Sequence, residues 1–328
     1  MKKVLLATSA IVAAGFVTTA SAAEWSSSVN GYWFVGAAIS DSDDNQDGFG
    51  VLRDGEIHFK ASLKADNGLT FGSRVELESF TSGDQIDENY ATIGGGFGTI
   101  MIGSNDDANY NSQVGVIYAP GARIGYYDTF IINPRNGSEF VGHSNAADVI
   151  GIHYATPNFN GFQANFSYQP RSGTDGGGDT NNVAFNDSAA GQVENIFAVG
   201  ANYTGDFDGF GFGISGGYLD GSGQNDILTV GANVGAAGFK IAGMFEDDGT
   251  DEFAVGVQYS NGPITLGAGY TFDDVSGVAG NTDDVQIAAG WLTYAIAPGV
   301  SGTVGVEYTD NSVGNETLGA QAFIALSF

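Results

Sequence analysis

Apolar and polar residues alternate along most of this chain with a period of two. Between 56 and 64, Ile57, Phe59, Ala61 and Leu63 alternate with charged and polar residues, and a second run of this kind follows at 69–78. Successive side chains of a strand point to opposite faces, so each run predicts a strand with one apolar and one charged face. The pattern continues in further segments, at 193–203, 210–218, 253–259, 264–272 and 300–308. An antiparallel sheet with one apolar face is therefore expected over most of the chain.

The connections between these runs fall into two classes. Some are tight turns rich in Gly, Asn, Asp and Pro, such as those at 66–68 and 261–263. The others are longer and acidic, and they lie at 41–50, 104–146, 172–191, 247–252 and 273–284. Short turns at one end and long loops at the other are typical of a strand meander between two compartments. A soluble two-sheet sandwich also alternates, but it does not explain the two classes of connection.

Counting the runs predicts one all-β domain over residues 23–328, a transmembrane antiparallel β-barrel of about sixteen strands. The short turns are expected on the periplasmic side, and the long loops outside. The last residues, 318–328, alternate up to a terminal aromatic, Phe328. In a closed barrel the last strand pairs with the first, so this segment is expected to pair with residues 24–39 and to face lipid with its apolar side chains.

The N-terminus has the features of an export signal. Lys2 and Lys3 precede a short apolar run, and small residues of the kind that signal peptidase cleaves follow it. Residues 1–22 are therefore predicted to be a signal peptide, cut after Ala22 or Ala23. After it, no stretch approaches the length of apolar sequence that a spanning helix needs.

Composition supports this class and narrows the partners. The chain has 52 Gly, no Cys and a formal net charge of -28. Many glycines together with many aromatic residues favour strands over helices, and the absence of Cys excludes a disulfide scaffold. Because nucleic acid is also negatively charged, a protein this acidic is not expected to bind it.

The longest break in the alternation lies between 104 and 148. It contains apolar residues at 116–118, 130–132 and 140, which are unusual in a solvated loop. We therefore expect this loop to fold into the lumen. The charged residues expected at the pore are those that point inward by strand parity and those of this loop: Lys60, Arg74, Glu76, Glu78, Asp106, Asp107, Arg123, Asp128, Arg135 and Glu139.

Two segments and the C-terminus resemble a known family. The segments DNGLTFGSRVELE at 66–78 and GGGFGTIMIG at 94–103, together with the terminal Phe328, are similar to Gram-negative general porins, in particular the alphaproteobacterial group that includes Rhodobacter-type porins. The resemblance implies a sixteen-stranded homotrimer whose third external loop narrows the pore, and a terminal Phe that the barrel assembly machinery reads. It also implies opposed charges across the constriction, although Met101 stands where many porins have an inward Arg.

The resemblance implies an outer-membrane general diffusion porin: a passive, water-filled channel for small hydrophilic solutes and ions. Because carboxylates at a pore favour cations and basic residues are few here, we expect a weak to moderate cation preference. Outer-membrane lipid and lipopolysaccharide are the expected surroundings. Two alternatives are a substrate-selective porin that uses loop tyrosines and a plugged barrel that binds partners at the cell surface.

Metal binding and catalysis have weaker support. Asp43, Asn45, Asp47 and Asp54 have the oxygen spacing of a calcium loop, but no helices flank them, and an acidic external loop explains them as well. No cofactor is required, and Ca²⁺ in the external loops is the one candidate. With three His, and without an H-E-x-x-H motif or a P-loop, the chain is not expected to be an enzyme.

Overall fold

The computed structural model describes residues 24–43, 47–80, 85–115, 117–119, 122–124, 148–172, 193–274, 283–310 and 315–328. In 117–119 and 122–124 only the backbone is described. Several sequence predictions lie outside these residues: the signal peptide at 1–22, and the site residues Asn45, Asp128, Arg135 and Glu139.

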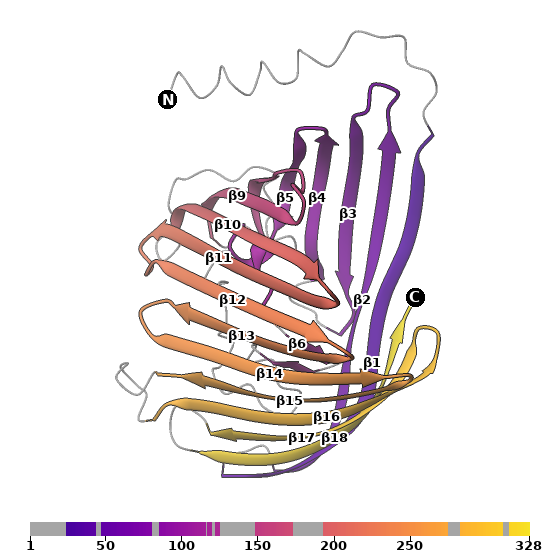
Figure 1. The fold of residues 1–328 in the computed structure, drawn as a ribbon, viewed down its shortest axis with the longest axis vertical. Helices are drawn as coiled ribbons and strands as arrows, with labels where there is room; N and C mark the ends of the chain where they lie inside the picture. Colours follow the sequence, from indigo (N-terminus) through magenta and orange to yellow (C-terminus); the bar gives the residue numbers. More distant parts are fainter. Residues whose placement is uncertain are drawn as a thin grey trace.

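Sixteen antiparallel strands close into one barrel, as predicted (Figure 1). Its first and last strands pair from Tyr32 opposite Ser327 to Ser42 opposite Thr317, and the backbone of Phe328 exchanges two hydrogen bonds with Gly31. The C-terminal segment therefore completes the wall. The strands are β1 (Ser26–Ser42), β2 (Gly48–Lys64), β3 (Thr70–Glu78), β4 (Ile86–Gly95), β5 (Gly98–Asn105), β8 (Val149–Ala155), β9 (Phe162–Arg171), β10 (Glu194–Phe207), β11 (Phe210–Ser222), β12 (Ile227–Ala236), β13 (Phe239–Asp247), β14 (Asp251–Asn261), β15 (Ile264–Asp273), β16 (Val285–Ala297), β17 (Val300–Asp310) and β18 (Glu316–Ser327).

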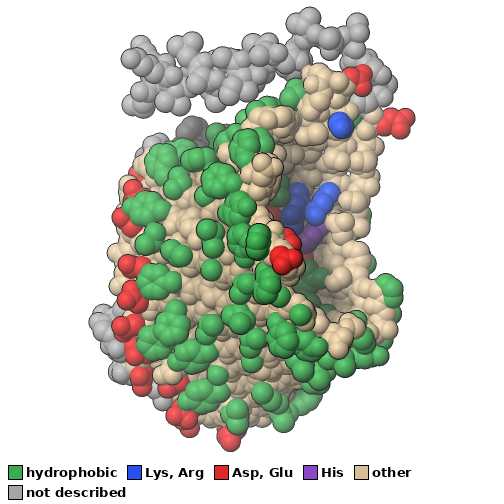
Figure 2. Space-filling model, viewed as in Figure 1, with side chains coloured by type: hydrophobic (Ala, Val, Ile, Leu, Met, Phe, Trp, Pro, Cys, Tyr) green, Lys and Arg blue, Asp and Glu red, His purple; other side chains and the backbone are tan. Residues whose placement is uncertain are grey.

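The barrel is apolar outside and polar inside. In β11, Phe210, Phe212 and Ile214 are exposed on the outer face. Ser215, which directly follows Ile214, is buried on the inner face. Figure 2 shows hydrophobic side chains spread over the outer surface of the strands. A water-soluble sheet would bury these side chains, so an apolar exterior around a polar interior indicates a barrel surrounded by hydrocarbon. Within the described residues, no helix is long and apolar enough to cross a membrane.

The two ends of the barrel differ, as the turn sequences predict. Seven tight turns lie at the end that also holds both termini of the barrel, and residues such as Asn160 and Asp208 adopt positive φ there, each followed by a Gly that does the same. Asn, Asp and Gly accept this conformation at low cost. The other end carries the longer connections. One of these is shorter than expected, because β13 and β14 are joined by 248–250 alone.

Candidate functional site

Three pairs of polar side chains lie on the inner face of β2 and β3. Across these strands Glu56 is opposite Glu78, His58 is opposite Glu76, and Lys60 is opposite Arg74. The positions between them point outward, and Phe59 is the most exposed of these on β2. Strand parity thus predicted the direction of Lys60, Arg74, Glu76 and Glu78 correctly. Their role at the pore stays a prediction.

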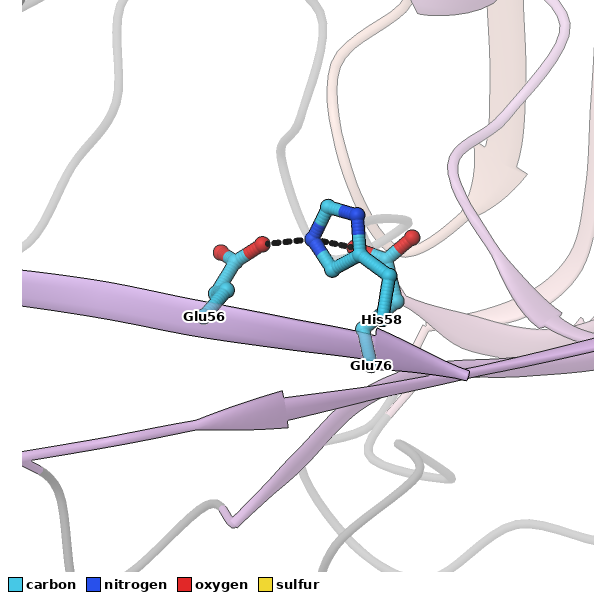
Figure 3. Close-up of side chains that lie close together, drawn as sticks. All are labelled: Glu56, His58 and Glu76. Carbon is cyan, nitrogen blue, oxygen red and sulfur yellow. Dashed lines mark hydrogen bonds and ion pairs between the residues drawn. The ribbon is translucent and has the colours of Figure 1, made fainter. Parts of the chain in front are cut away.

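Short polar contacts connect Glu56, His58, Glu76 and Arg74 with Glu88 of β4 into one network. Arg74 contacts Glu76 through its Nε, and the same atom lies 3.9 Å from Glu88 Oε2 on β4. His58 Nε2 lies 2.7 Å from Glu56 Oε2 and 3.3 Å from Glu76 Oε2 (Figure 3). The guanidinium and the imidazole therefore both bind Glu76, from its two sides.

Two acidic residues of β4 join this network, and the sequence did not reveal them. The register between β3 and β4 shifts after Val75, so the simple alternation fails at the start of β4. As a result Asp87 and Glu88, although adjacent, both reach inward: Asp87 groups with Glu56 and Glu78, while Glu88 approaches Arg74. Such a shift re-aims side chains. We call the resulting set the wall cluster; it consists of Glu56, His58, Lys60, Arg74, Glu76, Glu78, Asp87 and Glu88.

The wall cluster is acidic. Its five carboxylates face two cationic side chains, Lys60 and Arg74, so its formal charge is -3 with His58 neutral. Glu56 could have been recognised by its parity with Lys60. Asp87 and Glu88 could not, since one of two adjacent strand residues normally points outward.

The third loop starts at Asp106 and runs along the opposite inner wall. A short 3-10 helix, η1 (Tyr110–Ser112), and the residues around it lie against β9 to β12. Further along the loop, β6 (Ile117–Ala119) and β7 (Ala122–Ile124) pair with each other and contact β14 and β15. The described part of the loop therefore folds into the lumen, as predicted. We call residues 107–115 the loop anchor.

The loop anchor fits into a recess made by glycines. Gly200, Gly217 and Gly231 are inward positions on three successive strands, β10, β11 and β12. A Cβ at Gly200 would overlap Ser112, one at Gly217 would overlap Asn109, and one at Gly231 would overlap Gly115. The absence of side chains at these positions allows the loop backbone to approach the wall closely.

Hydrogen bonds and a small apolar cluster hold the loop anchor in this recess. Asn165 Nδ2 donates to Ser112 Oγ at 2.8 Å, and the backbone N–H groups of Ala108 and Val114 donate to serine hydroxyls of β9 and β11. Thr229 also donates to Asn109, and the Asn233 amide donates to the carbonyl oxygen of Val114. Ala108 packs in the apolar cluster of Val193, Ile196, Ala198, Leu219 and Ile227.

The acidic residues at the start of the loop have different environments. The Asp106 carboxylate groups with those of Glu88 and Asp148, next to the wall cluster. Asp107 is fully buried, and its Oδ1 accepts hydrogen bonds from the backbone N–H groups of Asn109 and Tyr110. The expectation that Asp107 lines the pore is therefore wrong, because its carboxylate stabilises the turn of the anchor and does not contact the lumen. Arg123 lies in β7, and its side chain is outside the described part of the structure.

Burial raises the pKa of Asp107 from its ordinary value of 3.8 to about 7, although the N–H groups of Tyr110 and Asn109 act in the opposite direction. The Asp107 carboxyl therefore binds a proton more tightly when the anchor is attached than when the anchor is detached and the carboxyl is solvated. Attachment is therefore strongest below the ordinary pKa and weakens as the pH rises toward 7. From pH 5 up to the raised pKa of about 7, each pH unit favours the detached anchor by up to about tenfold, so the ratio of detached to attached anchor is expected to rise up to roughly 100-fold between pH 5 and pH 8.

Amide hydrogen exchange of residues 108–115, corrected for the intrinsic pH dependence of exchange, measures this shift. Asp107→Asn is the control, because it can still accept the N–H bonds but does not titrate. It is expected to give the same protection at both pH values. Equal protection of the unmodified protein at pH 5 and pH 8 would contradict the prediction.

Asp54 lies far from Asp43, the first residue of the suggested calcium loop. β2 starts at Gly48, and Asp54 lies within it, opposite Phe34 of β1. Asp43 is nine residues beyond Phe34, which corresponds to ~30 Å along a strand. Asp54 is therefore not a ligand partner of Asp43 and Asp47, because the hairpin extends where the motif needs a closed loop. Calcium binding by Asp43, Asn45 and Asp47 stays a prediction.

Residues 213–217 match the letters of the G-x-S-x-G nucleophile motif, but their structure is different. The motif needs a sharp turn between a strand and a helix. Here Ser215 lies inside β11, and its Oγ accepts a hydrogen bond from the Val114 N–H at 3.1 Å. Ser215 thus holds the loop anchor.

The matching family model and two similar solved structures all describe porins. A family model described as Gram-negative porin matches residues 7–314. The anion-selective porin from Comamonas acidovorans has a similar structure, with a TM-score of 0.70 and 16% identity over 93% of this chain and 100% of that one. A mutant of the Rh. blastica porin gives a TM-score of 0.64 at 18% identity, over 92% of this chain and 100% of that one. No curated protein matches the chain by sequence.

Proposed function

The chain belongs to the Gram-negative porin family, and from that premise we propose that its channel passes small hydrophilic solutes and ions by passive diffusion, with a weak to moderate preference for cations. Porins are channels of the outer membrane and not enzymes. The family and the barrel therefore account for transport in general, and the side chains of the lumen must account for the selectivity.

The charge of the wall cluster is the observation that carries the cation preference. Five carboxylates and two cations lie on one patch of the inner face, so the local potential is negative at neutral pH. Carboxylates at a constriction favour cations and exclude anions. The rim supports the same sign. Figure 2 shows acidic side chains along the left edge of the barrel. Exposed aspartates lie at or beside the ends of β11 to β14: Asp220, Asp226, Asp247 and Asp251. An acidic entrance raises the local concentration of cations.

The name of the Comamonas porin does not argue against this proposal. That protein is called anion-selective, but at 16% identity the similarity extends to the fold alone. Ion selectivity depends on the charged side chains of the lumen, which can differ between barrels of one shape.

A measurement of reversal potential tests the proposal. The folded protein is inserted into a planar bilayer between two KCl solutions of different concentration. A reversal potential of the sign set by K⁺ flow toward the dilute side is expected, with a permeability ratio of K⁺ to Cl⁻ above one. The opposite sign would overturn the cation preference, and a folded sample without ion-conducting steps would overturn the channel itself.

The assembly and export of the protein follow from the same premise. We propose a homotrimer, surrounded by outer-membrane lipid and lipopolysaccharide, whose exposed terminal Phe328 is recognised by the barrel assembly machinery. Light scattering on the detergent-solubilised protein measures the number of copies. We also propose that residues 1–22 direct export, and N-terminal sequencing of the mature protein would locate the cleavage after Ala22 or Ala23.

A further inference from the structure

One nitrogen atom in the wall cluster faces two carboxylates. His58 Nε2 lies 2.7 Å from Glu56 Oε2 and 3.3 Å from Glu76 Oε2, and the ligand atoms of the three side chains lie within 4.8 Å of one another (Figure 3). An imidazole nitrogen carries at most one proton, so it cannot make a linear hydrogen bond to both oxygens. A metal ion between the three atoms would bind all of them at once.

The spacing of these atoms suits a small transition-metal ion. Ligand atoms about 2.0–2.2 Å from a tetrahedral zinc ion lie roughly 3.3–3.6 Å from each other. The distance between His58 Nε2 and Glu76 Oε2 already has this value, and Glu56 needs to withdraw by less than an ångström. Since Glu56 and His58 are two residues apart on β2, and Glu76 is the direct neighbour of His58 on β3, rigid strands hold all three on one face.

Outer groups orient both carboxylates. The Tyr32 hydroxyl donates to Glu56 Oε1 at 2.8 Å, and the Arg74 guanidinium binds Glu76 Oε1. Each carboxylate therefore has one oxygen held by a neighbour, and its other oxygen, Oε2, faces the imidazole. Hydrogen bonds of this kind to the ligands are typical of metal sites, where they fix the orientation of each ligand.

We propose that Glu56, His58 and Glu76 form a binding site in the lumen for Zn²⁺. One imidazole and two carboxylates are ligands that zinc accepts, and a fourth position toward the lumen remains for water. Ca²⁺ and Mg²⁺ prefer oxygen ligands alone, so they are the poorer fit. A bound ion would add two positive charges to a wall cluster whose formal charge is -3. The proposal does not depend on the cation preference, because binding can be measured without ion flow.

Calorimetric titration of ZnCl₂ into the folded, detergent-solubilised full-length protein tests the site. The protein carries no affinity tag and is treated with a chelator beforehand, so that its own residues are the only ligands. One saturable site per chain is expected. His58→Gln should weaken binding at least roughly tenfold, and Tyr32→Phe, which leaves all three ligands in place, should weaken it about 10- to 100-fold.

Two control variants make the result specific. His153→Gln removes another inward histidine. The double variant Glu246→Gln/Glu252→Gln removes two carboxylates of another acidic cluster, whose third member is Asp248. Both are expected to retain zinc binding. Circular dichroism and heat-dependent migration in gels establish that each variant is folded. The proposal is overturned if the unmodified protein shows no saturable binding, or if folded His58→Gln binds zinc as tightly as the unmodified protein does.

Discussion

Gly217→Val is expected to detach the loop anchor from the barrel wall and to increase the single-channel conductance. The new side chain would occupy the space of the buried Asn109 side chain, which accepts a hydrogen bond from Thr229. Adding methyl groups to a closely packed site typically costs about 1–3 kcal/mol. A loss of this size lowers the ratio of attached to detached anchor by roughly 5- to 150-fold. Because the third loop folds into the lumen, its detachment should widen the channel.

The adjacent residue offers a matched control. Gly216 is exposed on the outer face of β11, and the nearest atom to a Cβ there is the Thr229 carbonyl oxygen at 3.7 Å. Gly216→Val makes the same chemical change in the same strand without touching the anchor. It is expected to conduct like the unmodified protein in planar bilayers. The prediction is wrong if folded Gly217→Val and Gly216→Val channels have the same conductance.

Glu78→Lys together with Asp87→Lys is expected to reverse the ion selectivity. The carboxylates of these residues lie with that of Glu56 on the inner wall. Each substitution changes the charge by two units, so the double variant takes the wall cluster from a formal -3 to +1. The carboxylates of Glu56, Glu78 and Asp87 lie within 4.8 Å of one another, which is well inside the Debye length of about 10 Å at 0.1 M salt, so a passing ion senses the sum of their charges. The reversal potential in a KCl gradient should therefore change sign.

A neutral variant separates charge from shape. Glu78→Gln with Asp87→Asn keeps the size of both side chains and leaves the cluster at a formal -1. This variant should show a smaller reversal potential of the original sign. If the lysine variant is folded and conducting but keeps the full cation preference of the unmodified protein, then the wall cluster does not determine selectivity.

The sequence by itself determined the barrel and the direction of its side chains. Alternation has a period of two wherever a strand has one apolar face, so it is a local property that can be read along the chain. It predicted about sixteen strands, the pairing of the C-terminal segment with the first strand, and the inward direction of Lys60, Arg74, Glu76 and Glu78. The length and apolar content of 104–148 also gave the inward fold of the third loop.

Only the tertiary structure decided how the inward residues meet. The register shift between β3 and β4 brings Asp87 and Glu88 to the inner face together. The order of residues within β4 did not predict this shift. The environment of Asp107 depends on contacts of the anchor with strands about a hundred residues away, which bury it. Likewise, Glu56, His58 and Glu76 converge because pairing sets β3 beside β2. The direction of a side chain follows from the local backbone, so the alternation pattern is enough to predict it. The neighbours of a side chain depend on strand register and on packing between distant segments, and the alternation pattern carries no information about these.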